Sequence, residues 1–200
     1  MTFLFLGILV IALGAQIFLR LFGYMRIANI FKYIFYFSIA AIFSLLVYYS
    51  YQQYVVWQSV EPSKFLLPPY QAIDYFVKYV GARFFAPYLI SLIAAILFLF
   101  AAKRLNKKYE ERFFEPEELW LGALAIFLVG HPGWFFYFTG LILIYFLIHI
   151  FITFYYKLFF RISPREVRIS LRYMWIPLAI FVIIINKWLV ELEMWKLLKI

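Results

Sequence analysis

The chain contains no cysteine and only one aspartate, Asp74, among its 200 residues. Without cysteine there can be no disulfide, thiolate metal site, iron–sulfur cluster or cysteine nucleophile. The eight glycines are scattered, so neither a glycine-rich phosphate loop nor a serine in a nucleophile-elbow motif is present. From the sequence we therefore expect no cofactor and no metal site.

Charged residues are also scarce, at 14% of the chain, whereas 67% of the residues are hydrophobic and 24% are aromatic. A soluble core of this size cannot enclose apolar runs of nearly twenty residues, because each run would need a surrounding layer of protein. Lipid can supply that layer. We therefore expect an all-α, polytopic integral membrane protein that forms one membrane domain over residues 1–200.

Six apolar segments are expected to form the transmembrane helices. The fourth is ambiguous, because its dozen residues would cover only about 18 Å of a hydrocarbon core about 30 Å thick. It either crosses the membrane or dips in and returns. No lysine or arginine precedes the first run, which indicates a retained span and not a cleaved signal. The segments are residues 2–19, 31–56, 84–102, 119–130, 134–156 and 174–185.

The distribution of basic residues favours a fourth segment that crosses. In that case 13 of the 19 Lys and Arg residues lie on one side, in residues 20–32, 103–112 and 157–172. This bias follows the positive-inside rule and predicts six spans with both termini outside. We expect a bacterial inner membrane, with a mitochondrial membrane as the alternative that the sequence leaves open. Short basic clusters between apolar runs orient spans and meet anionic headgroups, so we expect lipid and not nucleic acid as a partner.

The polar segments predict three loops and several short amphipathic helices at the membrane surface. The loops are an outer one at 58–83 with an amphipathic segment at 70–80, an inner one at 103–118 and an inner basic one at 157–173. Helix starts are indicated at Glu115 and at Ser163, each followed by proline. Residues 187–200 are amphipathic. Aromatic residues at the end of the second span are expected at the headgroups: Tyr48, Tyr49, Tyr51, Tyr54 and Trp57.

The two histidines are candidate functional polar residues. His131 lies in a Pro-Gly turn, where it serves either to end a helix at the interface or to carry protons near neutral pH. His149 lies within the fifth span, where an ionisable residue is a functional candidate and otherwise bonds across helices as a neutral imidazole. A continuous helix between them separates the two by about 22 Å, so they cannot share a metal ion.

Glu117 and Glu118 are the catalytic candidates that the chain offers, although weak ones. Just ahead of the fourth span, a buried carboxylate there could act as an acid or a base. The alternative is that both are acids in the first turn of a helix, where the helix dipole favours them. Asp74 is expected to be solvated on the amphipathic outer segment.

Residues 112–185 resemble the C-terminal half of the type IV prepilin peptidases. FFEPEELWLGALAIFLVGHPGWFF and RISPREVRISLRYMWIPLAIF follow that family's order of a cytoplasmic loop, a short span, a turn with tryptophan, a second span, a basic loop and a final helix with proline. The resemblance rests on hydropathy and on the placement of small residues. The family uses two membrane-embedded aspartates, one in a Gly-x-Gly-Asp motif, whereas this stretch has Glu-Pro-Glu-Glu. The resemblance therefore implies no catalytic residue here.

Together these features predict a non-catalytic integral membrane subunit or scaffold of an inner-membrane or envelope assembly. Its partners would be other membrane proteins or further copies of the chain. One alternative is a divergent membrane enzyme like the prepilin peptidases, using Glu117 or Glu118. A third is a small transporter, which the short span interrupted at Gly130 suggests.

Overall fold

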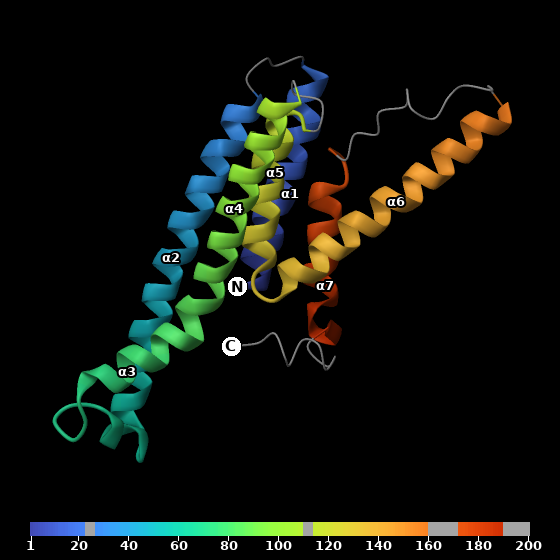
Figure 1. Ribbon diagram of the computed structural model, residues 1–200. Helices are drawn as coiled ribbons and strands as arrows, with labels where there is room; N and C mark the ends of the chain where they lie inside the picture. The colour runs from blue at the N-terminus through green and yellow to red at the C-terminus, as the bar shows by residue number, and fades with distance from the viewer. Residues whose placement is uncertain (23–26, 110–113, 160–171, 190–200) are drawn as a thin grey trace.

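The computed structural model describes residues 1–22, 27–109, 114–159 and 172–189, and its regular structure there is entirely helical (Figure 1). This confirms the all-α prediction. A 3₁₀ turn, Ser63–Leu66, and a π-helical segment, Gly81–Phe85, complete the elements. The helices are α1 (Thr2–Leu21), α2 (Ile27–Ser59), α3 (Ile73–Val80), α4 (Ala86–Lys108), α5 (Pro116–Val129), α6 (Gly133–Phe159) and α7 (Trp175–Leu189).

Five helices, α1, α2, α4, α5 and α7, form an up-and-down bundle (Figure 1). The end of α1, the start of α2, the end of α4 and the start of α5 lie together at one end of the bundle, which we call the arginine end after Arg20. The start of α1 and the turn between α5 and α6 lie at the other, which we call the histidine end after His131. Helix α6 leaves the bundle at an angle.

Helix α5 is the centre of this bundle. It packs most extensively against α4, α2 and α7, and the side chains from Ala123 to Leu128 are completely buried. A helix that is apolar on all sides is typical of a protein interior or a membrane span. Gly122 allows close packing, because a Cβ atom at that position would lie 2.6 Å from the Phe98 ring and 2.9 Å from the Trp175 ring.

Four segments of the described chain are long and apolar enough to cross a membrane, so the prediction of six by length and composition is too high. They are Thr2–Leu21, Asn29–Ser59, Ile73–Lys108 and Gly133–Tyr155. Helices α5 and α7 have only 14 and 15 residues, about 21 and 23 Å at 1.5 Å per residue. Because α5 is surrounded by protein, it does not have to match the hydrocarbon thickness.

Short as it is, α5 connects the two ends of the bundle. Glu117 in its first turn contacts Arg20 in the last turn of α1. Gly130 after its last turn lines a cavity together with Met1 and Thr2 at the start of α1. The segment at 119–130 therefore runs from one end of α1 to the other and does not turn back.

Beyond the histidine end, α2 and α3 form a small second core that corrects two predictions (Figure 1). Trp57 does not sit in an interfacial belt: it is buried, with its ring 5.3 Å from that of Phe76 and 4.8 Å from that of Tyr79. The third span does not begin at residue 84 either, because α3 continues through the π-helical segment into α4 over 36 residues. Phe76 and Val80, one turn apart on α3, pack in the same apolar cluster as Trp57 and so hold α3 against α2.

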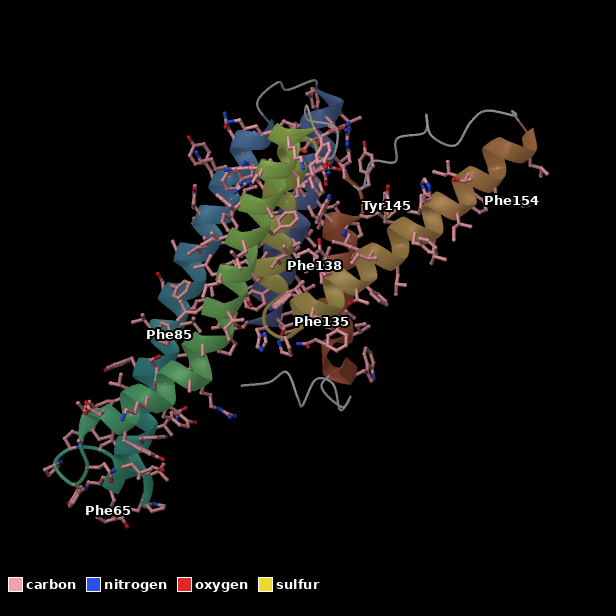
Figure 2. All side chains as sticks on the ribbon, in the orientation of Figure 1. Phe65, Phe85, Phe135, Phe138, Tyr145 and Phe154 are labelled. Atoms are coloured by element: carbon pink, nitrogen blue, oxygen red, sulfur yellow. The ribbon has the colours of Figure 1, made fainter. Side chains whose placement is uncertain are left out.

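Within the described part of the chain, the contacts of helix α6 with the bundle lie near its start. Tyr137, completely buried, donates a hydrogen bond of 3.0 Å to the Trp175 carbonyl, and Gly140 lies against Leu178 of α7. Further along, large side chains of α6 such as Tyr145 and Phe154 are exposed (Figure 2). The predicted helix start at Ser163, most of the loop at 157–173 and residues 190–200 lie outside the described residues.

Candidate functional site

The start of α5 is organised as the sequence predicts. Glu115 is the N-cap residue in an extended conformation, and Pro116 occupies the first turn. Glu115 and Glu118 form a reciprocal capping box, in which the Glu115 N–H donates to Glu118 Oε2 at 2.8 Å. The box satisfies backbone donors that a helix start otherwise leaves unpaired, so Glu118 has a structural task.

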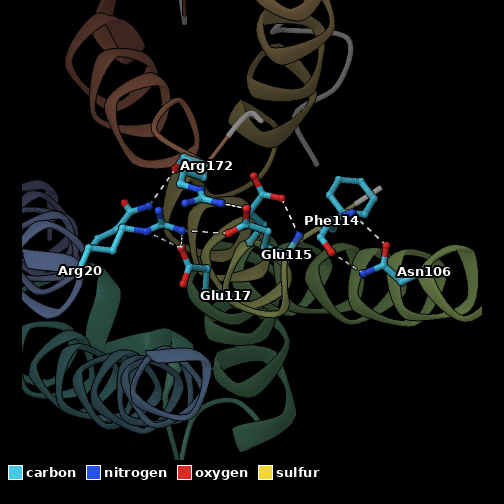
Figure 3. A network of polar contacts seen from close by, with 8 residues as sticks. Arg20, Asn106, Phe114, Glu115, Glu117 and Arg172 are labelled. Carbon is cyan, nitrogen blue, oxygen red and sulfur yellow. Dashed lines mark hydrogen bonds and ion pairs between the residues drawn. The ribbon is translucent and has the colours of Figure 1, made fainter. Parts of the chain in front are cut away.

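Arg20 joins the end of α1 to this helix start (Figure 3). Its Nη2 atom lies 2.9 Å from Glu115 Oε2 and 3.1 Å from Glu117 Oε1, and its Nε atom lies 3.3 Å from the same Glu117 oxygen. Arg172, close before α7, pairs with the other carboxylate oxygen of Glu115. Its carbonyl accepts a 3.0 Å hydrogen bond from Gln16 Nε2 on α1. Helices α1 and α5 and the approach to α7 thus share one ion-pair network.

Asn106 ties the end of α4 to the same region. Its Nδ2 donates to the Phe114 carbonyl at 2.6 Å, and its Oδ1 accepts from the Phe114 N–H at 2.9 Å (Figure 3). The buried side-chain amide of Asn106 thereby satisfies both the N–H and the carbonyl of Phe114. The contact holds the residue that leads into Glu115, and so fixes where α5 begins.

The predicted carboxylates are buried, but the observed contacts commit them to holding the bundle together. Glu117 is 7% exposed and is bonded to Arg20, while Glu118 is 2% exposed and caps the helix. Acid–base catalysis by a carboxylate pair needs two groups positioned toward one substrate. Here each side chain is directed to a guanidinium or to the backbone, which is how ion-pair networks that serve structure are built.

The two histidines lie on different parts of the structure, His131 in the turn before α6 and His149 within α6. His131 lies in the turn after Gly130, whose φ is 77°, and its ring centroid is 6.5 Å from that of Trp134. His149 is half-buried on α6 and stacks on Tyr145 of the same helix, with centroids 6.0 Å apart. Among the described residues, no group of three or more His, Cys, Asp and Glu side chains could hold a metal ion. Asp74 is exposed on α3.

Two neighbouring cavities lie at the histidine end. The first, of about 250 Å³, is lined by polar residues that include Thr2, Arg83, His131 and Asn186. The second, of about 460 Å³, is lined by Tyr49, Gln52 and Gln53. Both cavities are also lined by Met1, Arg83 and Tyr88. Arg83 is therefore the charged residue, among those described, that borders both cavities.

Four of these polar residues were not expected from the sequence as parts of a site: Arg20, Arg83, Asn106 and Arg172. Each arginine looked like one of many charges that orient spans. The only available signal was position, because Arg20 directly follows an uncharged run and Glu115-Pro-Glu-Glu118 directly precedes another. Their pairing links residues 95 and 97 positions apart, which no local pattern indicates.

Comparison of the chain with known proteins found no matching family model, no similar curated protein and no similar solved structure. The site is therefore interpreted from its own residues. The likeness of residues 112–185 to the prepilin peptidases stays a hypothesis.

Proposed function

We propose that the chain is a non-catalytic integral membrane subunit or scaffold that binds other membrane helices. The observation that carries this proposal is the engagement of the acidic residues at the start of α5. Glu115 and Glu117 hold Arg20, and Glu118 caps the helix. Buried carboxylates that join helices and cap a helix support a structural role more than a catalytic one.

Helix α6 supports the second half of the proposal. Its outer part carries a row of large apolar side chains along one face, at helical spacings i, i+4 and i+7, with Leu147 exposed by 63%, Phe151 by 73% and Phe154 by 66%. Among the described residues, the helices that contact it, α5 and α7, do so near its start, and the exposed row further along can meet lipid or another helix. Packing of aromatic and aliphatic side chains drives association between helices in lipid.

Purification in a mild detergent tests this role. We expect the chain to elute with a stoichiometric membrane-protein partner or as a homo-oligomer. Double replacement Leu147→Ala/Phe151→Ala on α6 should dissociate the complex. The matched control Ile11→Ala/Phe18→Ala changes one aliphatic and one aromatic residue on α1 that are also exposed, and should leave it intact. A monodisperse monomer without a partner would contradict the proposal, as would equal dissociation by the two double variants.

We propose further that the arginine end faces the inside and the histidine end, where α1 begins, faces the outside of a bacterial inner membrane. The excess of basic residues at 20–32, 103–112 and 157–172 supports this orientation. The chain has no native cysteine, so single cysteines at positions 107, 131 and 165 can be tested with a membrane-impermeant thiol reagent in intact cells. We expect labelling at 131 alone. Labelling of 107 in place of 131 would reverse the orientation.

A second candidate function is favoured by the burial of two adjacent carboxylates at the place where the resembling peptidases enter the membrane. In that case Glu117 or Glu118 would act as an acid or a base on a membrane-protein substrate. Replacing both with Gln and following the processing of co-expressed membrane proteins separates the two functions. Lost processing with an unchanged oligomer would favour the enzyme, and unchanged processing would remove it.

A further inference from the structure

None of the described residues that line the 250 Å³ cavity at the histidine end is acidic. Arg83 and His131 lie on its wall with the side chains of Thr2 and Asn186. Phe5, Leu128 and Ile183 make up part of the remaining wall. The cavity therefore combines groups that donate hydrogen bonds to an anion with an apolar surface.

Arg83 is situated differently from Arg20. It lies in the π-helical segment Gly81–Phe85, and π-helical segments occur frequently at functional sites. In the described part of the chain it forms no ion pair, whereas Arg20 pairs with two carboxylates. A cation in a cavity wall that has no acidic neighbour among the described residues attracts an anionic group.

Asn186 adds a second, independent observation. Its Oδ1 atom is buried and has no hydrogen-bond partner among the described residues. Buried side-chain amides are nearly always bonded, to protein, to water or to a ligand. Since the amide can turn to present either its oxygen or its nitrogen, Asn186 can bond a ligand's hydroxyl or its acidic oxygen.

We propose that this cavity binds the phosphate-bearing headgroup of a phospholipid, with Arg83 as the charged contact and His131 and Asn186 as hydrogen-bonding contacts. The volume is slightly below the ~300–1,000 Å³ of typical small-molecule pockets, so it suits a headgroup and not a whole lipid. Inorganic phosphate shares the anionic chemistry. The apolar wall and the exposed apolar sides of α1 and α4 nearby favour the lipid. The proposal does not depend on the scaffold role.

Native mass spectrometry of the purified full chain in detergent tests the site with added phosphatidylglycerol, diacylglycerol or inorganic phosphate. We expect phosphatidylglycerol to bind and diacylglycerol, which lacks the phosphate, to bind much more weakly. Arg83→Gln should lower the affinity for phosphatidylglycerol about tenfold or more, the effect of losing a charge-assisted hydrogen bond. The matched control is Arg104→Gln at the other end of α4, also exposed, which should change the affinity less than twofold.

Equal affinity of the Arg83→Gln variant and the unchanged chain for phosphatidylglycerol would overturn the proposal. So would equal binding of diacylglycerol. If an equal concentration of inorganic phosphate displaces the lipid, the ligand of this cavity is free phosphate and the lipid proposal is wrong. Thermal unfolding in the same detergent shows whether Arg83→Gln is folded. If it is not folded, two other variants test the site. Arg83→Lys should retain most of the binding of phosphatidylglycerol, and His131→Ala should lose a large part of it. The opposite pattern would reject the site.

Discussion

Helices α5 and α6 are joined by a short turn at residues 130–132 and are almost equally apolar, yet their surroundings are opposite. Leu124 on α5 is completely buried by other helices, whereas Leu147 on α6 is 63% exposed. One helix has 14 residues and starts in an ion-pair network, and the other has 27 and is free of charge over most of its length. Apolar composition alone thus does not tell protein contact from lipid contact.

The difference between the two helices lies in their length and in the residues at their starts. A helix in contact with lipid has to bridge the hydrocarbon, so α6 is long. A helix enclosed by protein does not, and the arginines around Glu115 and Glu117 can position its first turn at a fixed place. The following changes test this contrast, from the largest expected effect to the smallest.

Removing the cation at the start of α5 should have the largest effect. Arg20→Met would leave Glu117 buried without the arginine that bonds it, at a cost of about 4 kcal/mol in the free energy of unfolding. Titration with SDS in mixed micelles measures this loss. Adding Glu117→Gln to Arg20→Met should recover part of the stability, because the uncompensated charge is gone. If the double variant is no more stable than the single one, the pairing of Arg20 with Glu117 is not what stabilises the helix start.

Truncating matched leucines should separate the two helices directly. Leu124→Ala on α5 is expected to cost about 3 kcal/mol, because it leaves a cavity in a close-packed interior. Leu147→Ala on α6 removes a largely exposed side chain and should change the stability of the isolated chain by less than about 0.5 kcal/mol. Equal losses in the same titration would show that α6 is covered in the monomer.

Adding one methyl group to a glycine tests how closely each helix is approached. Gly122→Ala places a Cβ atom 2.6 Å from the Phe98 ring, so the rings must shift, at a cost of about 2 kcal/mol. Gly140→Ala on α6 meets Leu178 at 3.4 Å and should be nearly neutral. Thermal unfolding of the two variants side by side would reveal the difference. If Gly140→Ala is the more destabilised variant, the tighter contact lies on α6 and not on α5, contrary to this prediction.

Deleting one hydroxyl should have the smallest effect. Tyr137→Phe removes the hydrogen bond to the Trp175 carbonyl and should cost about 1 kcal/mol, since a buried acceptor loses its donor. Tyr145→Phe, further along α6 and 42% exposed, is the control and should be neutral. A neutral Tyr137→Phe would indicate that apolar packing alone attaches α6 to α7.

The positions of the helices could be predicted from the sequence to within a few residues, because apolar runs and helix-start signals are local. The predicted run at 2–19 became α1, and the start at Glu115 was placed correctly. The enclosure of α5 and the continuity of α3 with α4 could not be predicted. Both depend on contacts between segments far apart in the chain, such as Phe98 with Gly122 and Trp57 with Phe76.

The same distinction applies to the candidate site. Glu117 and Glu118 were identified as acids at a helix start, since that depends on neighbours in sequence. Their partner Arg20 was not identified, because the ion pair forms only once α1 and α5 lie together. Arg83 had no signal that separated it from the other basic residues.

The length of α2 has a mechanical consequence. Its 33 residues extend about 50 Å at 1.5 Å per residue, some 20 Å more than a hydrocarbon core about 30 Å thick. The aromatic cluster around Trp57 joins its far end to α3, and α3 runs without a loop into α4. The projecting part is therefore a stiff lever on two helical supports. A pull or a push at its tip would reach the bundle as a tilt of α4 against α5, instead of being absorbed by a slack connection.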